Sequence, residues 1–189
     1  MESALIVSCT EKSIAYLTEI LNAASYNHIV VLQSCGDARR LLLEREFDLV
    51  IINAPLHDES GESLSRYIAS KGISQVILVV KSEYFDAVSA VTEDDGVLVV
   101  AKPINKVVFW SVLQLARAAG KRLTRMQAEN SKLKQKIEDI RVIDRAKCIL
   151  ISHLNMSEQE AHRYMEKQAM DMRQTKRDIA EGILKTYEN

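Results

Sequence analysis

The sequence predicts an α/β chain: a doubly wound, parallel-sheet (βα)5 domain, then a helical coiled-coil linker and a three-helix C-terminal bundle. Three observations lead to this prediction. Short apolar runs alternate with helical stripes of apolar residues through positions 1–120. A heptad pattern follows at 121–143, and two helix-start motifs divide positions 144–189. These ranges are the expected domains.

The first range contains short apolar runs that are typical of strands in a buried parallel sheet. They cover residues 4–7, 29–32, 48–52, 76–80 and 97–100. Helical apolar stripes cover residues 14–24, 37–43, 61–68 and 107–119. Strands alternating with helices predict a parallel sheet with helices on both faces. Sites in such sheets lie at the carboxyl ends of the strands, so a functional site is expected there.

The net charge of -1 conceals an uneven distribution along the chain. Residues 1–120 carry 10 basic and 15 acidic side chains, whereas residues 121–189 carry 15 basic and 11 acidic ones. This asymmetry favours a basic C-terminal region that meets an anion, most simply a nucleic acid, although a solvated helical surface gives the same pattern. Aromatic residues make up only 5% of the chain, which argues against a stacking surface for single strands.

Neither a metal site nor a cofactor is expected, because Cys9, Cys35 and Cys148 are far apart and lack ligand-like spacing. An odd number of free thiols favours a reducing cytoplasm. No signal peptide opens the chain and no apolar run reaches ~18 residues, so membrane insertion is not expected. Enzymatic activity is not expected either, since the sequence has no Gly-rich phosphate loop and no recognisable nucleophile–base spacing.

The linker carries apolar residues at alternating spacings of 3 and 4, which is the pattern of a coiled-coil seam. Asn130 occupies an a position, which often fixes a two-stranded parallel register. We therefore expect a homodimer through this segment; the alternative is a single helix packed on the first domain. The expected dimerisation residues are Leu123, Met126, Asn130, Leu133, Ile137 and Ile140.

Two local motifs start helices in the C-terminal range. Ser157 and Glu160 form a capping box, and Thr175 with Asp178 repeats the arrangement. The inner stripe of the helix between them is expected to hold Ala161, Tyr164 or Met165, Gln168 or Ala169, and Met172. The residues expected to contact the phosphates or bases of a nucleic acid, which the family resemblance described below implies to be RNA, are Lys147, Arg163, Lys167, Met170, Arg173, Lys176 and Arg177. The alternatives are solvated surface charges and, for Met170, a core position.

The element order of the first domain, with Lys102-Pro103 after the fifth strand, resembles the receiver domain of bacterial response regulators. The resemblance covers about two thirds of the chain. Gly61 stands where receivers place a glycine after the phosphorylation site, and the resemblance implies a cis bond at Lys102-Pro103.

The active positions of the receiver family have changed in this chain. Ser8 and Cys9 replace the acidic pair that holds Mg²⁺, and Asn53 replaces the phosphoacceptor aspartate. Val80 and Val99 stand at the Ser/Thr and aromatic switch positions. An amide is a poor nucleophile and this pair offers no hard carboxylates, so a pseudo-receiver without phosphorylation is expected. Lys102 remains, either as a structural residue or as an anion ligand. A regulatory protein, a small ligand or no input at all are open.

Four short motifs in the C-terminal range together resemble the ANTAR domain. They are A-K-x-I-L at 146–150, S-E-x-E-A at 157–161, Q-A-M-D-x-R at 168–173 and A-x-x-I-L at 180–184. Cys148 departs from the family, which more often has glycine there. The resemblance implies a dimeric transcription antiterminator that binds paired hairpins in nascent messenger leaders and prevents terminator formation. The alternative is a DNA-binding response regulator with a C-terminal helix-turn-helix.

Overall fold

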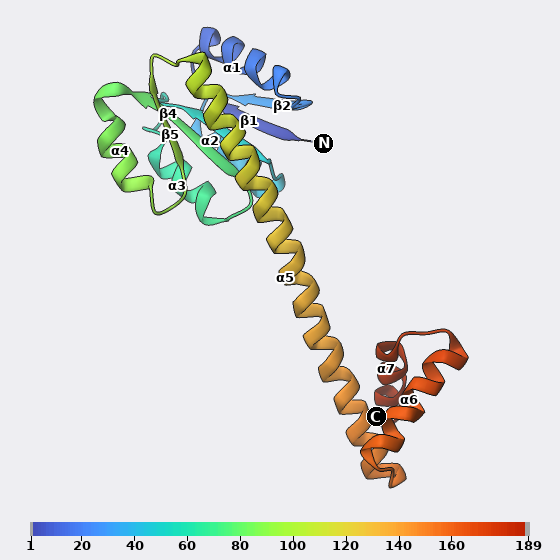
Figure 1. The fold of residues 1–189 in the computed structure, drawn as a ribbon. Coiled ribbons are helices and arrows are strands. Elements are labelled where there is room, and N and C mark those ends of the chain that lie inside the picture. The colour runs from blue at the N-terminus through green and yellow to red at the C-terminus, as the bar shows by residue number, and fades with distance from the viewer. Residues whose placement is uncertain (1, 188–189) are drawn as a thin grey trace. The chain divides into compact units, whose positions relative to one another are not determined.

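The computed structural model describes residues 2–187. The chain divides into two compact units, Met1–Arg125 and Met126–Asn189, and each is described by itself. Figure 1 shows the strands and helices of both. No helix within the described residues is long and apolar enough to cross a membrane.

The first unit is built on a five-stranded parallel sheet with strand order β2-β1-β3-β4-β5. The strands are β1 (Ser3–Val7), β2 (His28–Leu32), β3 (Leu49–Asn53), β4 (Gln75–Lys81) and β5 (Leu98–Lys102). Every residue of β3 is buried, as expected for a central strand covered on both faces. The predicted doubly wound α/β fold is confirmed.

Helices cover both faces of this sheet (Figure 1). On one face α1 (Glu11–Ala23) and the first turns of α5 (Lys106–Leu154) pack through Leu17, Leu21, Phe109 and Leu113. The other face is covered by α2 (Cys35–Glu44), α3 (Glu62–Ser70) and α4 (Phe85–Thr92), which follows the short η1 (Ser82–Tyr84). Two apolar clusters therefore hold the sheet between two layers of helices.

The predicted (βα)5 order requires a helix between the fourth and fifth strands, but no apolar stripe marks its position in the sequence; the structure places α4 there. This helix has only 8 residues and buries only Val88 and Thr92. Two turns give too few repeats for a periodic apolar stripe to be recognised. The helix exists because a right-handed crossover must connect β4 to the parallel strand β5, which is a requirement of topology and not of local pattern.

The second unit packs the end of α5 against α6 (Glu158–Met172) and α7 (Lys176–Tyr187). Its buried core consists of Ala146, Leu150, Ala161, Met165, Ile179, Ala180 and Ile183. Small residues at three of these positions let the helices approach closely. The unit is the three-helix arrangement expected from the sequence.

Two sharp turns separate these helices. Asn155 and Arg173 both adopt positive φ, at 50° and 52°. The predicted capping box before α6 is confirmed, because Ser157 Oγ accepts from the Glu160 amide while the Glu160 carboxylate accepts from the Ser157 amide. Thr175 and Asp178 exchange the same pair of hydrogen bonds before α7. Local sequence therefore sets where both helices begin.

Candidate functional sites

The carboxyl ends of β1, β3 and β5 bring Ser8, Asn53 and Lys102 to one edge of the sheet. Ser8 and Asn53 are both buried, and the Asn53 amide nitrogen donates a 2.9 Å hydrogen bond to Ser8 Oγ. The Asn53 side-chain oxygen is also buried and has no partner within the described residues. This pair joins two adjacent strands through neutral groups.

Lys102 donates from Nζ to the backbone carbonyl of Ala54, the residue after Asn53. Burial is the main cause that lowers the pKa of its ammonium group, and the positive charge of Lys81 lowers it further. The Lys102-Pro103 bond is cis, as the receiver resemblance implies, and so is Ala54-Pro55. Lys102 is therefore occupied by the loop that follows β3.

The remaining residues of this edge also have partners. Cys9 Sγ donates to the carbonyl of Gln33 at 3.2 Å, and Val80 is buried in the apolar cluster. The carboxylate of Asp58 accepts from the backbone amides of Cys35 and Gly36. The amide of Gly36 is the larger of the causes that hold the pKa of Asp58 below its ordinary value. The Asp58 carboxylate therefore caps the amino end of α2, where the helix dipole places a partial positive charge.

The basic side chains of the second unit fall into two groups. Arg163, Lys167 and Arg173 are exposed and form no ion pair with any residue of 2–187. Lys147, Lys176 and Arg177 are partly buried and engaged with carboxylates. The first group is available to an external anion, whereas the second must exchange partners to bind one.

The engaged group links the helices of the bundle. Lys147 is only 16% exposed and lies 3.1 Å from Asp144 and 3.8 Å from Glu158. Arg177 of α7 bonds Asp139 of α5 at 2.5 Å and Glu181 at 2.9 Å. The Arg177 bond is the main cause that lowers the pKa of Asp139. Sequence spacing could reveal the pair three residues apart, but not one that joins positions 139 and 177.

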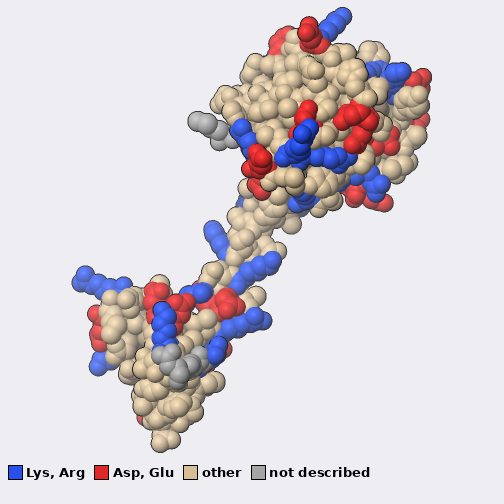
Figure 2. Space-filling model, turned by 180° about the vertical axis from the view of Figure 1, so that it is seen from behind, with Lys and Arg blue, Asp and Glu red and all other residues tan. Residues whose placement is uncertain are grey.

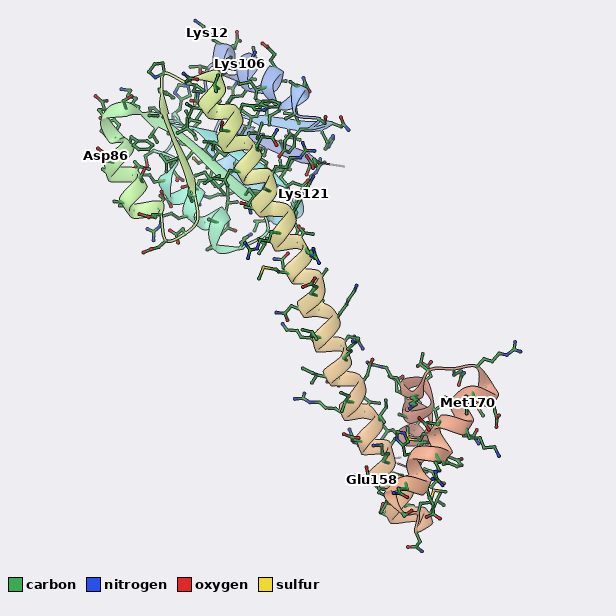
Figure 3. The ribbon with its side chains drawn as sticks, viewed as in Figure 1. Lys12, Asp86, Lys106, Lys121, Glu158 and Met170 are labelled. Atoms are coloured by element: carbon green, nitrogen blue, oxygen red, sulfur yellow. The ribbon has the colours of Figure 1, made fainter. Side chains whose placement is uncertain are left out.

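Met170 is 72% exposed near the carboxyl end of α6 (Figure 3). The alternative of a core position for Met170 is therefore wrong. Met172, expected in the inner stripe, is 59% exposed, and Tyr164 is 38% exposed. Met165 and Ala169 face the core instead. Because side chains of adjacent positions on a helix are about 100° apart, a choice between neighbours is settled by packing and not by spacing alone.

The excess of basic residues in the C-terminal part of the chain does not belong to the three-helix bundle. Residues 121–136 carry 6 basic and 1 acidic side chains, whereas residues 137–189 carry 9 basic and 10 acidic ones. On the second unit in Figure 2, acidic side chains lie among the basic ones. Within the basic region expected at 121–189, the positive charge is therefore concentrated on the middle of α5.

The middle of α5 also exposes most of the predicted seam. Met126, Leu133, Ile137 and Ile140 are 56%, 60%, 53% and 58% exposed, and Asn130 is exposed with them. Leu123 is partly buried. A run of large apolar side chains left open to water is typical of a surface that meets another molecule.

The fold and the site at the strand ends define the class of protein: a receiver-like domain joined to a helical bundle. Residues 131–184 match the ANTAR domain family. The chain is 25% identical over 173 residues to the transcriptional regulatory protein PdtaR of Mycobacterium tuberculosis, covering 90% of this chain and 83% of that protein. The chain thus carries a match to the ANTAR domain in its second unit, is similar over most of its length to a transcriptional regulatory protein, and has a receiver-like fold in its first unit.

Solved receiver structures share the fold of the first unit. The signal receiver domain of an HD domain-containing protein from Pseudomonas fluorescens Pf-5 superposes with a TM-score of 0.58 at 22% identity, covering 66% of this chain and 92% of that one. The response regulator TrrA from Thermotoga maritima superposes with a TM-score of 0.53 at 22% identity, covering 61% of this chain and 99% of that one. At this identity the likeness establishes the fold alone.

Proposed function

We propose that this ANTAR-domain transcriptional regulator is an RNA-binding antiterminator. Its bundle binds paired hairpins in a nascent messenger leader and so prevents the terminator hairpin from forming. The proposal rests mainly on one observation: Arg163, Lys167 and Arg173 are exposed and unpaired within the described residues, and they accompany the exposed Met170 on the bundle that matches the ANTAR family.

The chemistry of these side chains suits a hairpin loop. An A-form stem has a deep, narrow major groove that side chains cannot read, whereas loop bases are splayed out and accessible. Guanidinium and ammonium groups contact phosphates, and a flexible thioether packs against the face of a base. A surface of Arg163, Lys167 and Met170 on one helix offers both kinds of contact.

We further propose that the protein acts as a homodimer through the α5 seam. The exposed apolar residues Leu133, Ile137 and Ile140 support this, since a parallel coiled coil would cover them. Two bundles in one molecule then bind two hairpins of one leader. The second contact becomes intramolecular, so its effective concentration increases the overall affinity without any new contact.

The DNA-binding alternative is less well supported by the side chains that begin α7. A helix-turn-helix recognition helix presents its amino-terminal residues to base edges in the major groove. In this chain Lys176 lies 2.6 Å from Glu166, and Arg177 is held by Asp139 and Glu181. Lys176 and Arg177, the basic residues that begin α7, thus already form ion pairs within the bundle.

A gel-shift panel tests RNA against DNA. The full chain is titrated against a two-hairpin leader RNA, a single hairpin, an RNA duplex and DNA duplexes of matched length. We expect the two-hairpin RNA to bind most tightly. DNA binding of equal or greater affinity would overturn the proposal. Arg163→Ala with Lys167→Ala should weaken RNA binding, while Lys185→Ala, an exposed basic residue of α7 outside this surface, serves as the matched control.

The receiver-like domain is proposed to work without phosphorylation, as a docking domain for a regulatory protein or ligand. The Asn53 amide cannot form an acyl phosphate, and Ser8 gives no carboxylate for Mg²⁺. Incubation of the protein with acetyl phosphate and Mg²⁺, followed by intact-mass measurement, should show no added phosphate. A stable aspartyl phosphate in the first unit would contradict this part of the proposal.

A further inference from the structure

A pocket opens at the amino ends of the strands, on the edge of the sheet away from Ser8, Asn53 and Lys102. It has a volume of about 310 Å³ and lies entirely within the first unit. Residues at or just before the starts of β1, β2, β3 and β4 line one side, and residues of α5 line the other. Its polar and charged lining residues include Glu2, Tyr26, Asp48, Gln75, Arg117 and Lys121.

Tyr26 is a buried wall of this pocket, with only 3% of its surface exposed. Its hydroxyl forms no hydrogen bond with any residue of 2–187, whereas buried hydroxyl groups usually have a partner. Burial is the main cause that raises the pKa of this phenol to about 12, so the hydroxyl is neutral at pH 7. Water can supply a partner, so the charges around Tyr26 decide which other molecule the pocket takes.

Three charged groups act on the Tyr26 hydroxyl, and all of them line the pocket: Glu2, Arg117 and Asp48. Glu2 and Arg117 neutralise one another, because Glu2 Oε2 lies 2.7 Å from Arg117 Nε. Asp48 forms no ion pair with a described residue, and only its Oδ2 accepts hydrogen bonds, from the amide and the hydroxyl of Ser3. A carboxylate without a cationic partner therefore lies near the hydroxyl, with Oδ1 open to a donor.

A positive charge stands on the α5 side of the pocket, at Lys121 (Figure 3). Its side chain is 67% exposed, and its ion pair with Glu2 is long, at 3.6 Å. The preceding residue, Gly120, lets α5 approach β4 closely, since a Cβ there would lie 3.2 Å from Gln75 Cγ. The Gln75 side-chain amide has no hydrogen-bond partner within residues 2–187. The pocket thus offers a carboxylate, a hydroxyl and an amide on one side and an ammonium group on the other.

We infer that this pocket binds a small zwitterion of the α-amino acid class, with its ammonium group between Tyr26 and Asp48 and its carboxylate at Lys121. Ile73 and Ala116 give apolar surface for a small side chain. Such a ligand would fasten α5 to the edge of the sheet at the residues that lead into the seam. The inference rests on the proposed role of the receiver-like domain as a docking domain, and it does not depend on RNA binding.

Molecules with a single charge fit this pocket less well. A simple anion meets the negative charges of Glu2 and Asp48, and a simple cation meets the positive charges of Arg117 and Lys121. Either one leaves a charged group of the pocket facing a like charge, which is unfavourable. A zwitterion pairs with the open carboxylate and with the loosely held ammonium group while the Glu2–Arg117 pair stays intact. The charge arrangement therefore selects a ligand that carries both signs.

The test measures amino acid binding to the full chain. A panel of L-amino acids at one millimolar concentration is screened by thermal unfolding followed through Trp110, and the strongest binder is titrated by calorimetry. Its decarboxylated amine and its deaminated acid are matched probes with the same carbon skeleton. We expect both analogues to bind roughly tenfold more weakly than the amino acid. No binding by any amino acid, or equal binding by an analogue, would overturn the inference and leave the RNA gel-shift result unaffected.

Two variants locate the binding site. Tyr26→Phe removes a hydroxyl that holds no bond in the fold, so the protein should stay as stable as before while affinity for the amino acid falls roughly tenfold. Asp48→Asn should weaken binding of the amino acid and of the amine, but not of the deaminated acid. Tyr84→Phe changes an exposed tyrosine outside the pocket and is the matched control. Unchanged affinity in a folded Tyr26→Phe variant would overturn the assignment of this pocket, even if Asp48→Asn proves unstable through loss of its bonds to Ser3.

Discussion

At the scale of the residue, Gly61 explains why the loop after β3 has the path it has. Its φ is +89°, in the left-handed region that side chains with a Cβ rarely adopt. A Cβ built there would lie 2.9 Å from Ile52 Cγ2 and 3.4 Å from Leu78 Cδ1. The glycine is therefore needed for its backbone conformation and also for the close packing of α3 on the sheet.

Gly61→Ala should destabilise the first unit by about 3 kcal/mol, since the left-handed conformation costs about 1–2 kcal/mol and the overpacking adds a similar amount. Urea unfolding followed through Trp110, the one tryptophan of the chain, measures the effect in that unit. Gly72→Ala is the control: its φ is +64°, but nothing lies within 4 Å of the new Cβ. A loss no larger than that of Gly72→Ala would show that the packing contact is unimportant.

The thiols differ in reactivity for physical reasons. Burial raises the pKa of the Cys35 thiol to about 12, and the negative charges of Asp58 and Glu59 add to the effect. Cys148 is exposed. Since the thiolate is the nucleophile, iodoacetamide at neutral pH should alkylate Cys148 long before Cys35. Peptide mass mapping over time measures both rates, and Cys148→Ser should lose the fast phase. Equal rates would contradict the burial of Cys35 in solution.

At the scale of the element, ion pairs add to the apolar contacts that hold α7 on the bundle. Arg177 joins α7 to Asp139 of α5, and Lys176 joins it to Glu166 of α6. Both carboxylates have pKa values below their ordinary range, mainly because of these hydrogen bonds. Their favourable contribution is present above the unfolded pKa of about 4 and is lost as pH falls through the lower folded values.

The second unit should therefore lose stability as pH falls below about 4. Thermal unfolding followed by far-ultraviolet circular dichroism over a series of pH values measures this loss. Asp139→Asn removes one of the groups, so its Tm should depend less on pH than that of the original protein. Asp171→Asn changes an exposed carboxylate of α6, and it is the matched control. The same pH dependence in both variants would count against a role for Asp139.

Structural features that depend on residues close together in the sequence could be predicted, whereas features that depend on contacts between distant parts of the chain could not. Ser157 and Glu160 are three positions apart, so their capping box can be read directly. The Asp139–Arg177 pair spans 38 positions and depends on how α5 and α7 pack. The proximity of Ser8 and Asn53 could be predicted because both residues lie at the carboxyl ends of parallel strands, which meet at the same edge of the sheet. The carbonyl that Lys102 contacts follows from the path of a loop, which no pattern encodes.

At the scale of the whole molecule, the excess of basic side chains is concentrated in one stretch of α5, residues 121–136, and not spread over the C-terminal part of the chain. The basic residues of the 121–136 stretch include Lys132 and Lys136, which are exposed, four positions apart and on one face of α5. Asp139, the partner of Arg177, lies one turn further on that side. We predict that an RNA bound at the bundle continues along α5 and places phosphates beside these two lysines.

Lys132→Ala with Lys136→Ala should reduce the salt dependence of RNA binding. Each lost phosphate contact lowers the slope of log affinity against log salt by about 0.7–0.9, so the double variant should lose roughly 1.5. Lys134→Ala is the matched control, because Lys134 is exposed on a different face of α5. A slope that changes equally in the control, or not at all in the double variant, would exclude this stretch from the contact.

The proposed dimer makes the affinity for two hairpins depend on residues that touch no RNA. Leu133→Lys with Ile137→Lys puts charges into the seam, so sedimentation should show monomers, and affinity for two-hairpin RNA should fall to that for one hairpin. Affinity for a single hairpin should stay unchanged, since the bundle core excludes both positions. Ala128→Lys adds a charge outside the seam and should alter neither measurement. Tight two-hairpin binding by a monomeric variant would mean that one bundle is sufficient.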